Sequence, residues 1–408
     1  MTIAITGGYV VPVDGDPIDS GTVLIDGSTI AAVGTATDVH IPDGAERIDA
    51  RGQWVLPGFV DAHAHLGVHE DGEGWSGNDT NEKTDPNGAR FRAVDGIDPH
   101  EIGFDDALAG GVTSAVIKPG SANPIGGQTV AVKTWGRTAL DLVFREQVSV
   151  KSALGENPKR VYGEKDKTPA TRLGVAATIR EAFTEARNYA ARRDHAAAEG
   201  KPFDTDLTYE ALNKVLDGTL AWDQHTHRAD DIVTAIRLAD EFGYRLIVNH
   251  GTEGHRIADL LAERDVQVIL GPLFTARAKV EVRHRTMRAA GILDRAGVRL
   301  AITTDHPVVP IDFLVYQAIV AVKEGLDPAS ALRALTANPA AMLGLDDRVG
   351  SLRPGIDADV VLWSGDPLDI YNRAMRVFVG GRDVYRFDPE RGEGVVADRL
   401  YRERPATT

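Results

Sequence analysis

Short apolar runs separated by glycine and aspartate dominate the first part of the chain, residues 1–57. Runs at residues 3–6, 9–12, 22–27 and 30–34 have the composition and the turn punctuation of short β-strands. Strands at this spacing are typical of a small β-sandwich. These strands alone are too few to close a hydrophobic core.

The same strand-and-turn pattern returns near the other end of the chain, in residues 355–363 and 377–385. The two ends of a chain commonly meet in space. We therefore expect residues 1–57 and 350–408 to form one discontinuous β-sandwich domain.

Apolar strands alternate with helical patterns between these two segments, in residues 58–349. The candidate strands are residues 112–117, 148–150, 245–249, 266–270 and 299–303, and the helical patterns cover residues 230–242, 256–263, 280–296 and 313–323. Alternation fits both a (β/α)8 TIM-like barrel and a doubly wound sheet. Polar residues follow the strand ends at several separate places, as in a barrel whose loops gather on one face. We predict an α/β fold with a barrel catalytic domain.

Two stretches fit neither pattern. Residues 68–100 are rich in glycine, aspartate and asparagine, which indicates a long active-site loop. Residues 170–218 contain a charged, alanine-rich pattern, which indicates a long helix on the surface of the barrel.

Composition places the chain among soluble globular proteins, with 43% hydrophobic and 26% charged residues among 408. Such a length exceeds one compact core of ordinary size unless the core is a large barrel. No apolar run approaches the ~20 residues of a membrane span, and the first residues have no signal-peptide pattern. We expect a cytoplasmic protein without membrane partners.

The chain contains no cysteine, which excludes disulfides and thiolate ligands. Any metal ion must therefore be held by histidine, carboxylate or modified lysine. The net charge of −15 disfavours nucleic-acid partners.

An apolar run at residues 54–60 predicts a buried strand, which leads into His63-Ala64-His65. Side chains alternate along a strand, so His63 and His65 point the same way, with Cα atoms about 6–7 Å apart. Two imidazoles at this spacing can converge on one metal ion. A lone His-x-His also arises by chance, and buried histidines often bind only backbone groups, so the pair needs support from elsewhere.

Further potential ligands follow other predicted strands, and they are Lys151, Glu156, His225, His227, His250, Asp305 and His306. Such residues at successive strand ends are hard to explain by chance. Histidine and carboxylate ligands suit Zn²⁺, with Mn²⁺, Fe²⁺ or Co²⁺ as alternatives.

The chain resembles the metal-dependent amidohydrolase superfamily, in the branch that includes imidazolonepropionase-like and prolidase-like hydrolases. The resemblance covers nearly the whole chain and rests on the run at residues 56–65, His225, His250-Gly251, Thr304-Asp305 and a terminal signature at residues 350–361. It implies a (β/α)8 barrel flanked by a β-sandwich from both termini. It also implies a small-molecule substrate, and homo-oligomers are common in the superfamily.

The resemblance carries metal-ligand roles onto matching residues. His63 and His65 match the first-strand ligands, His225 (with His227 as the alternative) matches the fifth-strand ligand, and His250 matches the sixth-strand ligand. Asp305 matches the eighth-strand aspartate, which in such enzymes accepts a proton from the attacking water and passes it to the leaving group. One or two divalent ions are implied.

The fourth-strand ligand has two candidates, because relatives use either a carboxylated lysine or a glutamate. Strand alternation places Glu156 on the face of Val148 and Val150, and Lys151 on the opposite face. Glu156 also lies nearer the predicted strand end. We favour Glu156 and keep Lys151 as its rival. A structural role would make Lys151 a surface residue and Glu156 a turn cap.

The residue two positions after His225 narrows the reaction. Relatives that deaminate aromatic rings commonly carry glutamate there, and this chain has His227. The substitution favours hydrolysis of an amide, lactam or peptide-type C–N bond. Candidate substrate contacts are His227, Arg228, Tyr162 and His306. Arg228 suits a substrate carboxylate, although an ion pair with Asp230 or Asp231 is an equal alternative.

We therefore predict a metal-dependent hydrolase of an amide C–N bond in an N-acyl amino acid, a dipeptide or a cyclic amide. An imidazolonepropionase-type ring opening would use the same ligands and is the alternative. A third reading is a binding protein that keeps the fold without the chemistry. Retention of the five matching ligands disfavours this last reading.

Overall fold

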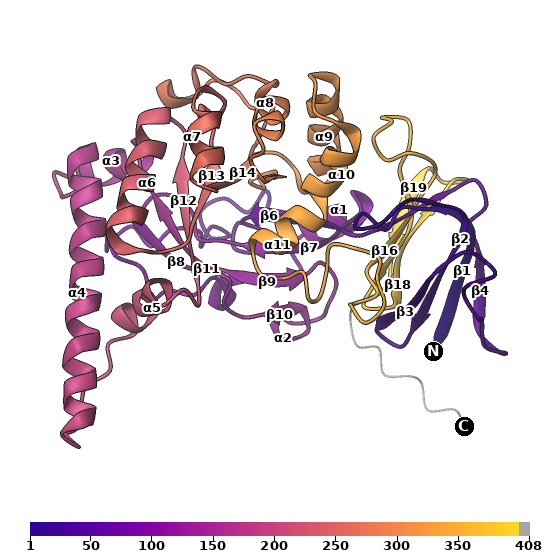
Figure 1. Cartoon of the computed structure of the whole chain (residues 1–408), viewed down its shortest axis with the longest axis horizontal. Helices are drawn as coiled ribbons and strands as arrows, with labels where there is room; N and C mark the ends of the chain where they lie inside the picture. Colours follow the sequence, from indigo (N-terminus) through magenta and orange to yellow (C-terminus); the bar gives the residue numbers. More distant parts are fainter. Residues whose placement is uncertain (400–408) are drawn as a thin grey trace.

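Strands from both ends of the chain share one nine-stranded sheet (Figure 1). The computed structural model describes residues 1–399. The sheet order is β19-β18-β17-β16-β5-β1-β2-β3, with β4 paired to β1. The strands are β1 (Thr2–Val10), β2 (Ile18–Asp26), β3 (Thr29–Gly34), β4 (Glu46–Asp49), β5 (Trp54–Pro57), β16 (Val360–Trp363), β17 (Ala374–Val379), β18 (Arg382–Asp388) and β19 (Glu393–Val396). Buried aliphatic side chains from both ends, among them Ile5, Val23, Val55 and Val360, pack into one core.

The predicted continuous strand at residues 54–60 is wrong, because the chain leaves the sheet at Gly58. Strand β5 ends at Pro57, and β6 (Phe59–Ala64) begins in a different sheet. A Cβ atom on Gly58 would lie 2.0 Å from the Thr113 hydroxyl oxygen, so only glycine fits this crossing. The first ligand-bearing strand is therefore attached directly to the nine-stranded sheet.

The middle of the chain contains two further sheets and gives the mixed α/β fold that the sequence predicts. One has the order β10-β9-β7-β6, and the other has the order β15-β14-β13-β12-β11-β8. Their strands are β6, β7 (Val112–Ile117), β8 (Ile125–Gln128), β9 (Val130–Lys133), β10 (Val143–Arg145), β11 (Ser149–Ala153), β12 (Ala221–Thr226), β13 (Leu246–His250), β14 (Gln267–Leu270) and β15 (Leu300–Ile302). Strand β6 is parallel to β7, and β11 to β15 are parallel to one another.

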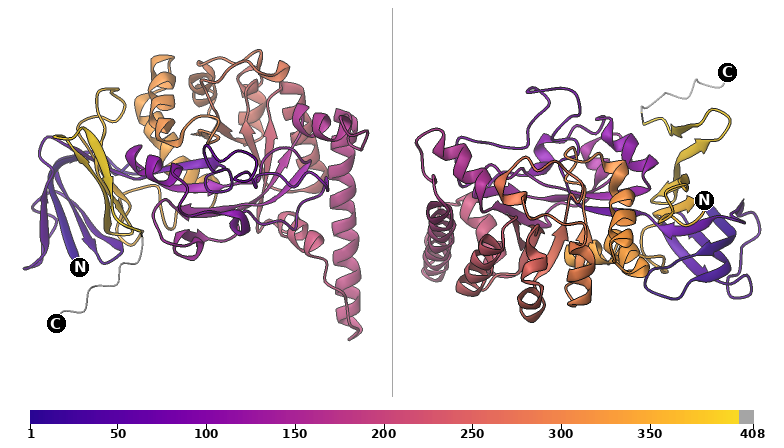
Figure 2. Two further views of the ribbon diagram at one scale, coloured as in Figure 1. Left: turned by 180° about the vertical axis from the view of Figure 1, so that it is seen from behind. Right: turned by 90° about the horizontal axis from the view of Figure 1, so that it is seen from above.

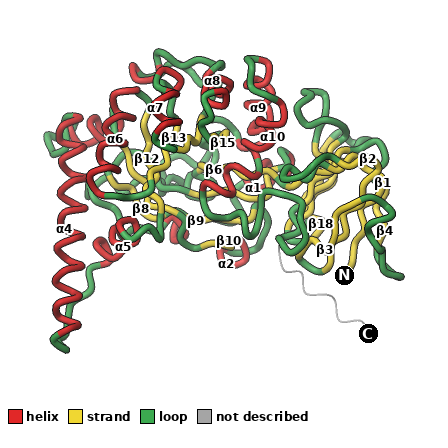
Figure 3. The backbone as a smooth tube through the Cα atoms, viewed as in Figure 1, coloured by secondary structure: helices red, strands yellow, loops and turns green. Residues whose placement is uncertain are grey.

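Helices lie on the outside of these two sheets (Figures 2 and 3). They are α1 (Gly103–Ala109), α2 (Ala139–Leu142), α3 (Glu156–Gly163), α4 (Arg172–Ala198), α5 (Leu207–Leu216), α6 (Ala229–Phe242), α7 (Ala258–Glu263), α8 (Ala289–Arg295), α9 (Leu314–Lys323), α10 (Pro328–Leu335) and α11 (Ala337–Met342). Helix α6 confirms the predicted pattern: its apolar face is buried, acidic residues occupy its first turn, and Gly243 ends it at a φ of +75°.

The helix expected at residues 280–296 is only partly present. A short 3₁₀ turn, η3 (Val280–Val282), precedes α8, and the residues between them form no helix. The physical reason lies in side-chain contacts, because Glu281 is buried and the Arg285 guanidinium binds the backbone carbonyl and the hydroxyl of Thr275. These contacts hold an irregular loop at the mouth of a cavity.

Helix α4 is the long surface helix that the sequence predicts, and it projects beyond the rest of the molecule (Figure 1). Its first part packs through Val175, Ile179 and Phe183, whereas residues beyond Tyr189 are largely exposed. No helix within residues 1–399 combines the length and the apolarity that crossing a membrane requires.

Candidate metal centre

Strands of the two inner sheets carry most of the predicted ligands at or near their carboxyl ends. His63 lies on β6 and His65 follows it, Lys151 lies on β11, His225 lies on β12 and His227 follows it, and His250 ends β13. Asp305 follows β15. Because β11 to β15 run parallel, their carboxyl ends meet at one edge of their sheet. The hydrogen bond from the Asp305 N–H to the His63 carbonyl joins the end of β6 to the same edge.

Asp305 contacts both histidines of the first strand. Its Oδ1 atom lies 3.3 Å from Nε2 of His63 and 3.3 Å from Nε2 of His65. One ligand atom each from His63, His250 and Asp305 lies within 4.8 Å of the others. Such spacing is compatible with a single ion between them.

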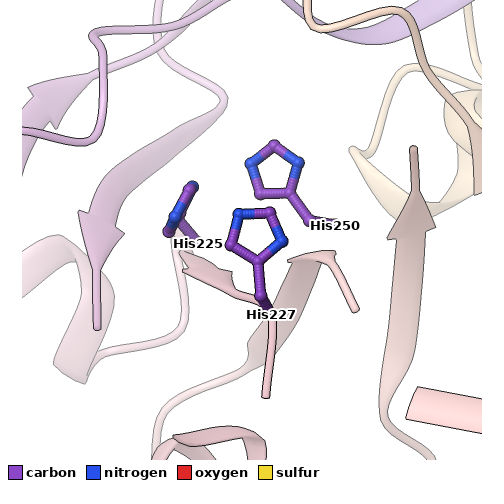
Figure 4. Close-up of side chains that lie close together, drawn as sticks. All are labelled: His225, His227 and His250. Carbon is purple, nitrogen blue, oxygen red and sulfur yellow. The ribbon is translucent and has the colours of Figure 1, made fainter. Parts of the chain in front are cut away.

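A second group overlaps the first and consists of His225, His227 and His250 (Figure 4). Ring centroids of His225 and His250 are 4.4 Å apart, and those of His227 and His250 are 4.8 Å apart. Ligand atoms of the three residues also lie within 4.8 Å of one another. His250 belongs to both groups, which makes one continuous cluster.

Hydrogen bonding of the imidazoles fits a metal centre. The rings of His63 and His225 are buried, and none of their nitrogen atoms has a hydrogen-bond partner within the described residues. Buried polar groups without partners are rare, because they lose the free energy of hydration without compensation. By contrast, Nδ1 of His65 lies 2.7 Å from the Lys118 carbonyl, and Nδ1 of His250 lies 2.7 Å from the Gly271 carbonyl. Such contacts fix the ring and leave Nε2 for a metal.

Burial keeps the histidines in the form that binds metals. It lowers the pKa values of His63, His225 and His227 far below the ordinary range, and the positive charge of Lys151 contributes in the same direction. For His250, burial is again the main cause and lowers the pKa to about 4. At neutral pH these rings are neutral, as ligation requires.

Lys151, and not Glu156, is buried and contributes through its charge to the lowered pKa values of the histidines. The Lys151 side chain is fully buried, its Nζ donates to the Pro119 carbonyl at 3.3 Å, and burial lowers its pKa to about 8. Glu156 starts helix α3 and lines a different cavity. Extending the strand alternation to Glu156 was wrong, because β11 ends at Ala153 and Gly155 turns the chain at a φ of +89°.

Asp305 has an unusual backbone conformation, with a φ of +54°. Burial raises its pKa, but the hydrogen bond with His65 and the charges of neighbouring histidines and Lys151 outweigh burial, so the net shift is downward. The backbone N–H of Asp305 donates to the His63 carbonyl at 3.1 Å. The carboxylate is therefore held ionised beside the first-strand histidines.

A cavity of about 770 Å³ opens over this cluster. His65, His225, His227 and Asp305 contribute to its wall. The other predicted substrate contacts do not line it. Arg228 forms an ion pair with Asp230, Tyr162 is buried and donates to Asn123, and His306 is buried with neither ring nitrogen hydrogen-bonded within the described residues.

Sequence reasoning missed a buried charge network next to the ligands. Lys118 forms an ion pair with Asp223, and neither side chain has exposed surface. Lys118 also donates to Asn249 at 3.2 Å, and Ser149 donates to Asp223 at 3.0 Å. The sequence feature that could have revealed this network is Lys118, a charged residue directly after the apolar run at residues 112–117. The network links strands β11, β12 and β13 with the segment that follows β7.

The sequence pattern of the amidohydrolase family matches residues 127–385. This chain belongs to the amidohydrolase family. A solved structure of an amidohydrolase from Thermotoga maritima MSB8 is 43% identical, covers 94% of this chain and 100% of its own, and superimposes with a TM-score of 0.91. The superfamily resemblance seen in the sequence motifs is thereby confirmed.

Two curated relatives are more distant. Amidohydrolase tasK of Hapsidospora irregularis is 29% identical over 88% of this chain, which spans only 39% of that protein's length. The imidazolonepropionase of Porphyromonas gingivalis is 27% identical over 83% of this chain and 82% of its own.

Proposed function

We propose that this amidohydrolase cleaves an amide C–N bond in an N-acyl amino acid, a dipeptide or a cyclic amide, with the help of a divalent metal ion. The observation that carries the proposal is the position of the Asp305 carboxylate, 3.3 Å from Nε2 of both His63 and His65. A carboxylate at such a place is suited to proton transfer beside a metal.

The residues that would hold one or two ions are His63, His65, Lys151, His225, His250 and Asp305. Zn²⁺ suits this nitrogen-rich donor set best, and Mn²⁺, Fe²⁺ and Co²⁺ are alternatives. When bound, a divalent cation supplies a Lewis acid that acidifies water and polarises a carbonyl group. A buried lysine with a pKa of about 8 has an appreciable neutral fraction, which is the form that CO₂ carboxylates.

Asp305 has the general base and acid role in this proposal. Its lowered pKa keeps the carboxylate ionised at neutral pH, ready to accept a proton from water. The same atom then returns the proton to the leaving nitrogen. The His227 ring lies on the cavity wall, with Nδ1 2.7 Å from the Thr252 hydroxyl. In this proposal it contacts the substrate next to the carbonyl group that is hydrolysed.

We also propose how the three sheets are divided between two domains. Residues 58–349 form a (β/α)8 barrel, which is supported by the contact between β6 and β15 through the Asp305 N–H and the His63 carbonyl. Residues 1–57 and 350–399 form the flanking β domain, which is supported by their shared sheet. Residues 400–408, which the sequence analysis assigned to the same domain, lie outside the described residues.

An imidazolonepropionase-type ring opening is the second candidate, because the relative from P. gingivalis carries that name and spans most of the chain. Both reactions would use the same ligands. Assays of imidazolone propionate beside panels of N-acyl amino acids and dipeptides distinguish the two.

The decisive experiment compares wild type with His63→Ala and Asp305→Asn after loading with Zn²⁺ or Mn²⁺. We expect turnover of a panel substrate by the wild type and its loss in both variants, with unchanged circular dichroism. Elemental analysis should show less metal in His63→Ala. Full activity in either variant, or a wild type that neither binds metal nor turns over any substrate, contradicts the proposal and favours a binding role.

A further inference from the structure

The wall of the active-site cavity has a charge opposite to that of the whole chain. The chain has a formal net charge of −15. Among the residues that line the cavity, the basic ones are Lys83, Arg160 and Lys279, and the acidic one is Asp305. Because Asp305 belongs to the metal cluster, the part of the wall left for recognition is basic. Basic walls inside an acidic protein favour anionic ligands.

Lys279 is the basic residue best placed to contact a substrate. It lies in the loop between β14 and α8, and about one third of its side chain is exposed. It lines the cavity together with His225 and His227, and its positive charge contributes to the lowered pKa values of both histidines. Lys83 and Arg160 are more exposed and lie at the mouth of the cavity.

A buried carboxylate holds the Lys279 ammonium in position. Oε1 of Glu281 lies 3.6 Å from Nζ of Lys279 and 3.7 Å from Nε2 of His227. Glu281 is itself buried, and its Oε2 accepts the backbone N–H of Glu156 at 2.9 Å. The lysine therefore stands beside His227, with its position set by a fixed acid.

Arg228, which the sequence suggested as the contact of a substrate carboxylate, is already paired with another side chain. Its guanidinium donates to both carboxylate oxygens of Asp230, at 2.8 and 2.7 Å. It also lines a different cavity, next to helix α3. A substrate in the cavity above the metal cluster meets Lys279 and not Arg228.

We propose that Lys279 determines specificity by binding a carboxylate of the substrate, with Glu281 as its positioning residue. The inference rests on the proposed amide hydrolysis and narrows its substrate to an acid, such as an N-acyl amino acid with a free carboxylate. An ammonium–carboxylate contact of this kind persists through the reaction, so it lowers KM and leaves kcat nearly unchanged.

The test compares wild type, Lys279→Met and Lys279→Arg on matched substrates. The substrates are N-acetyl amino acids and the corresponding N-acetylamines, which have the same side chain and no carboxylate. Lys201→Met, which removes an exposed lysine paired with Glu199 beyond helix α4, is the control. We expect Lys279→Met to raise KM for the acids about 10- to 150-fold, the loss of one charged hydrogen bond. Its kcat and its KM for the amines should stay as in wild type, and Lys279→Arg should retain the preference for acids.

A binding measurement separates the failure of this inference from the failure of the proposed function. Succinate and succinamide are titrated calorimetrically into wild type and Lys279→Met. If wild type hydrolyses the panel and Lys279→Met keeps the same ratio of KM values, the inference is wrong and the function stands. If wild type hydrolyses nothing, the function fails. In that case the affinity for succinate tests the role of Lys279. Equal dissociation constants in both proteins reject this role, and a loss of affinity in Lys279→Met for succinate but not for succinamide supports it.

Discussion

Thr304 donates two hydrogen bonds to the carboxylate of Asp61, from its hydroxyl at 2.5 Å and from its backbone N–H at 3.2 Å. Asp61 precedes His63 by two residues, and Thr304 directly precedes Asp305. The other Asp61 oxygen accepts the hydroxyl of Thr303 and the backbone N–H of His63. One carboxylate thus fixes the distance between two proposed metal ligands.

The variant Asp61→Asn should weaken metal binding without unfolding the protein. In this variant an NH₂ group replaces one carboxylate oxygen and faces the N–H and O–H groups that now donate to Asp61. Because donors cannot bond to one another, His63 and Asp305 shift relative to each other. Loss of a residue that orients ligands typically lowers metal affinity about 10- to 100-fold. Competition with a chromophoric chelator measures Zn²⁺ affinity, and Asp38→Asn, in an exposed turn, is the control. Equal affinities in wild type and Asp61→Asn would contradict this role.

Lys151 and Glu156 can be separated by metal content. We expect Lys151→Ala to bind less Zn²⁺ per chain, since Lys151 is buried and its charge contributes to the lowered pKa values of His63 and His250. Glu156→Ala should bind as much metal as wild type, because this residue begins α3 beside another cavity. Elemental analysis after dialysis gives the answer. Normal metal content in Lys151→Ala combined with a loss in Glu156→Ala would reverse our assignment.

The metal-free protein should lose stability as the pH falls below 6.5. Burial lowers the pKa values of His250 and His306 from 6.5 to about 4. Between these values the unfolded chain binds protons that the folded chain does not, so the free energy of unfolding decreases as the pH falls. It is unaffected by these groups above pH 6.5. The slope is about 1.4 kcal/mol per pH unit for each histidine.

Urea unfolding of chelator-treated protein at pH 7, 6 and 5 measures this dependence. The variant His306→Leu removes one of the buried histidines with a lowered pKa and should show a shallower slope. Identical midpoints at pH 7 and pH 5 in wild type would show that these rings are not held neutral.

Gly58→Ala should destabilise the fold, because the added Cβ atom would lie 2.0 Å from the Thr113 hydroxyl oxygen. Overpacking of this kind costs about 1–3 kcal/mol. Gly15→Ala is the matched control, since no atom lies within 4 Å of its added Cβ. Thermal melts of both variants test the prediction. A melting temperature for Gly58→Ala equal to that of Gly15→Ala would show that Thr113 moves aside freely.

The sequence predicts elements best where one period dominates. The apolar run at residues 112–117 is strand β7, and the periodic pattern at residues 230–242 lies within helix α6. It fails where a single residue decides the path of the chain. Gly58 splits an apolar run into two sheets because of a neighbour more than fifty residues away, and no local pattern carries that information.

The candidate site residues were likewise predictable on regular strands and not in irregular loops. The histidines His63, His225 and His250 were identifiable because each stands at a strand end, where parallel strands converge. Lys279 and Glu281 escaped notice because they lie in an irregular loop whose pattern resembles a helix. Tyr162 and Arg228 have suitable chemistry in sequence, but their tertiary partners Asn123 and Asp230 take up their polar groups.

The pairing of β5 with β16 joins residue Trp54 to Trp363 in register. Strand β6, which carries His63, continues directly from β5. During synthesis, the segment that anchors the strand of His63 therefore remains an unpaired edge on this side until residues 360–363 have emerged. The face that carries the proposed ligands can reach its final geometry only after β16 has paired with β5, so truncations between Asp305 and β16 should yield chains that retain every proposed ligand yet assemble the site poorly.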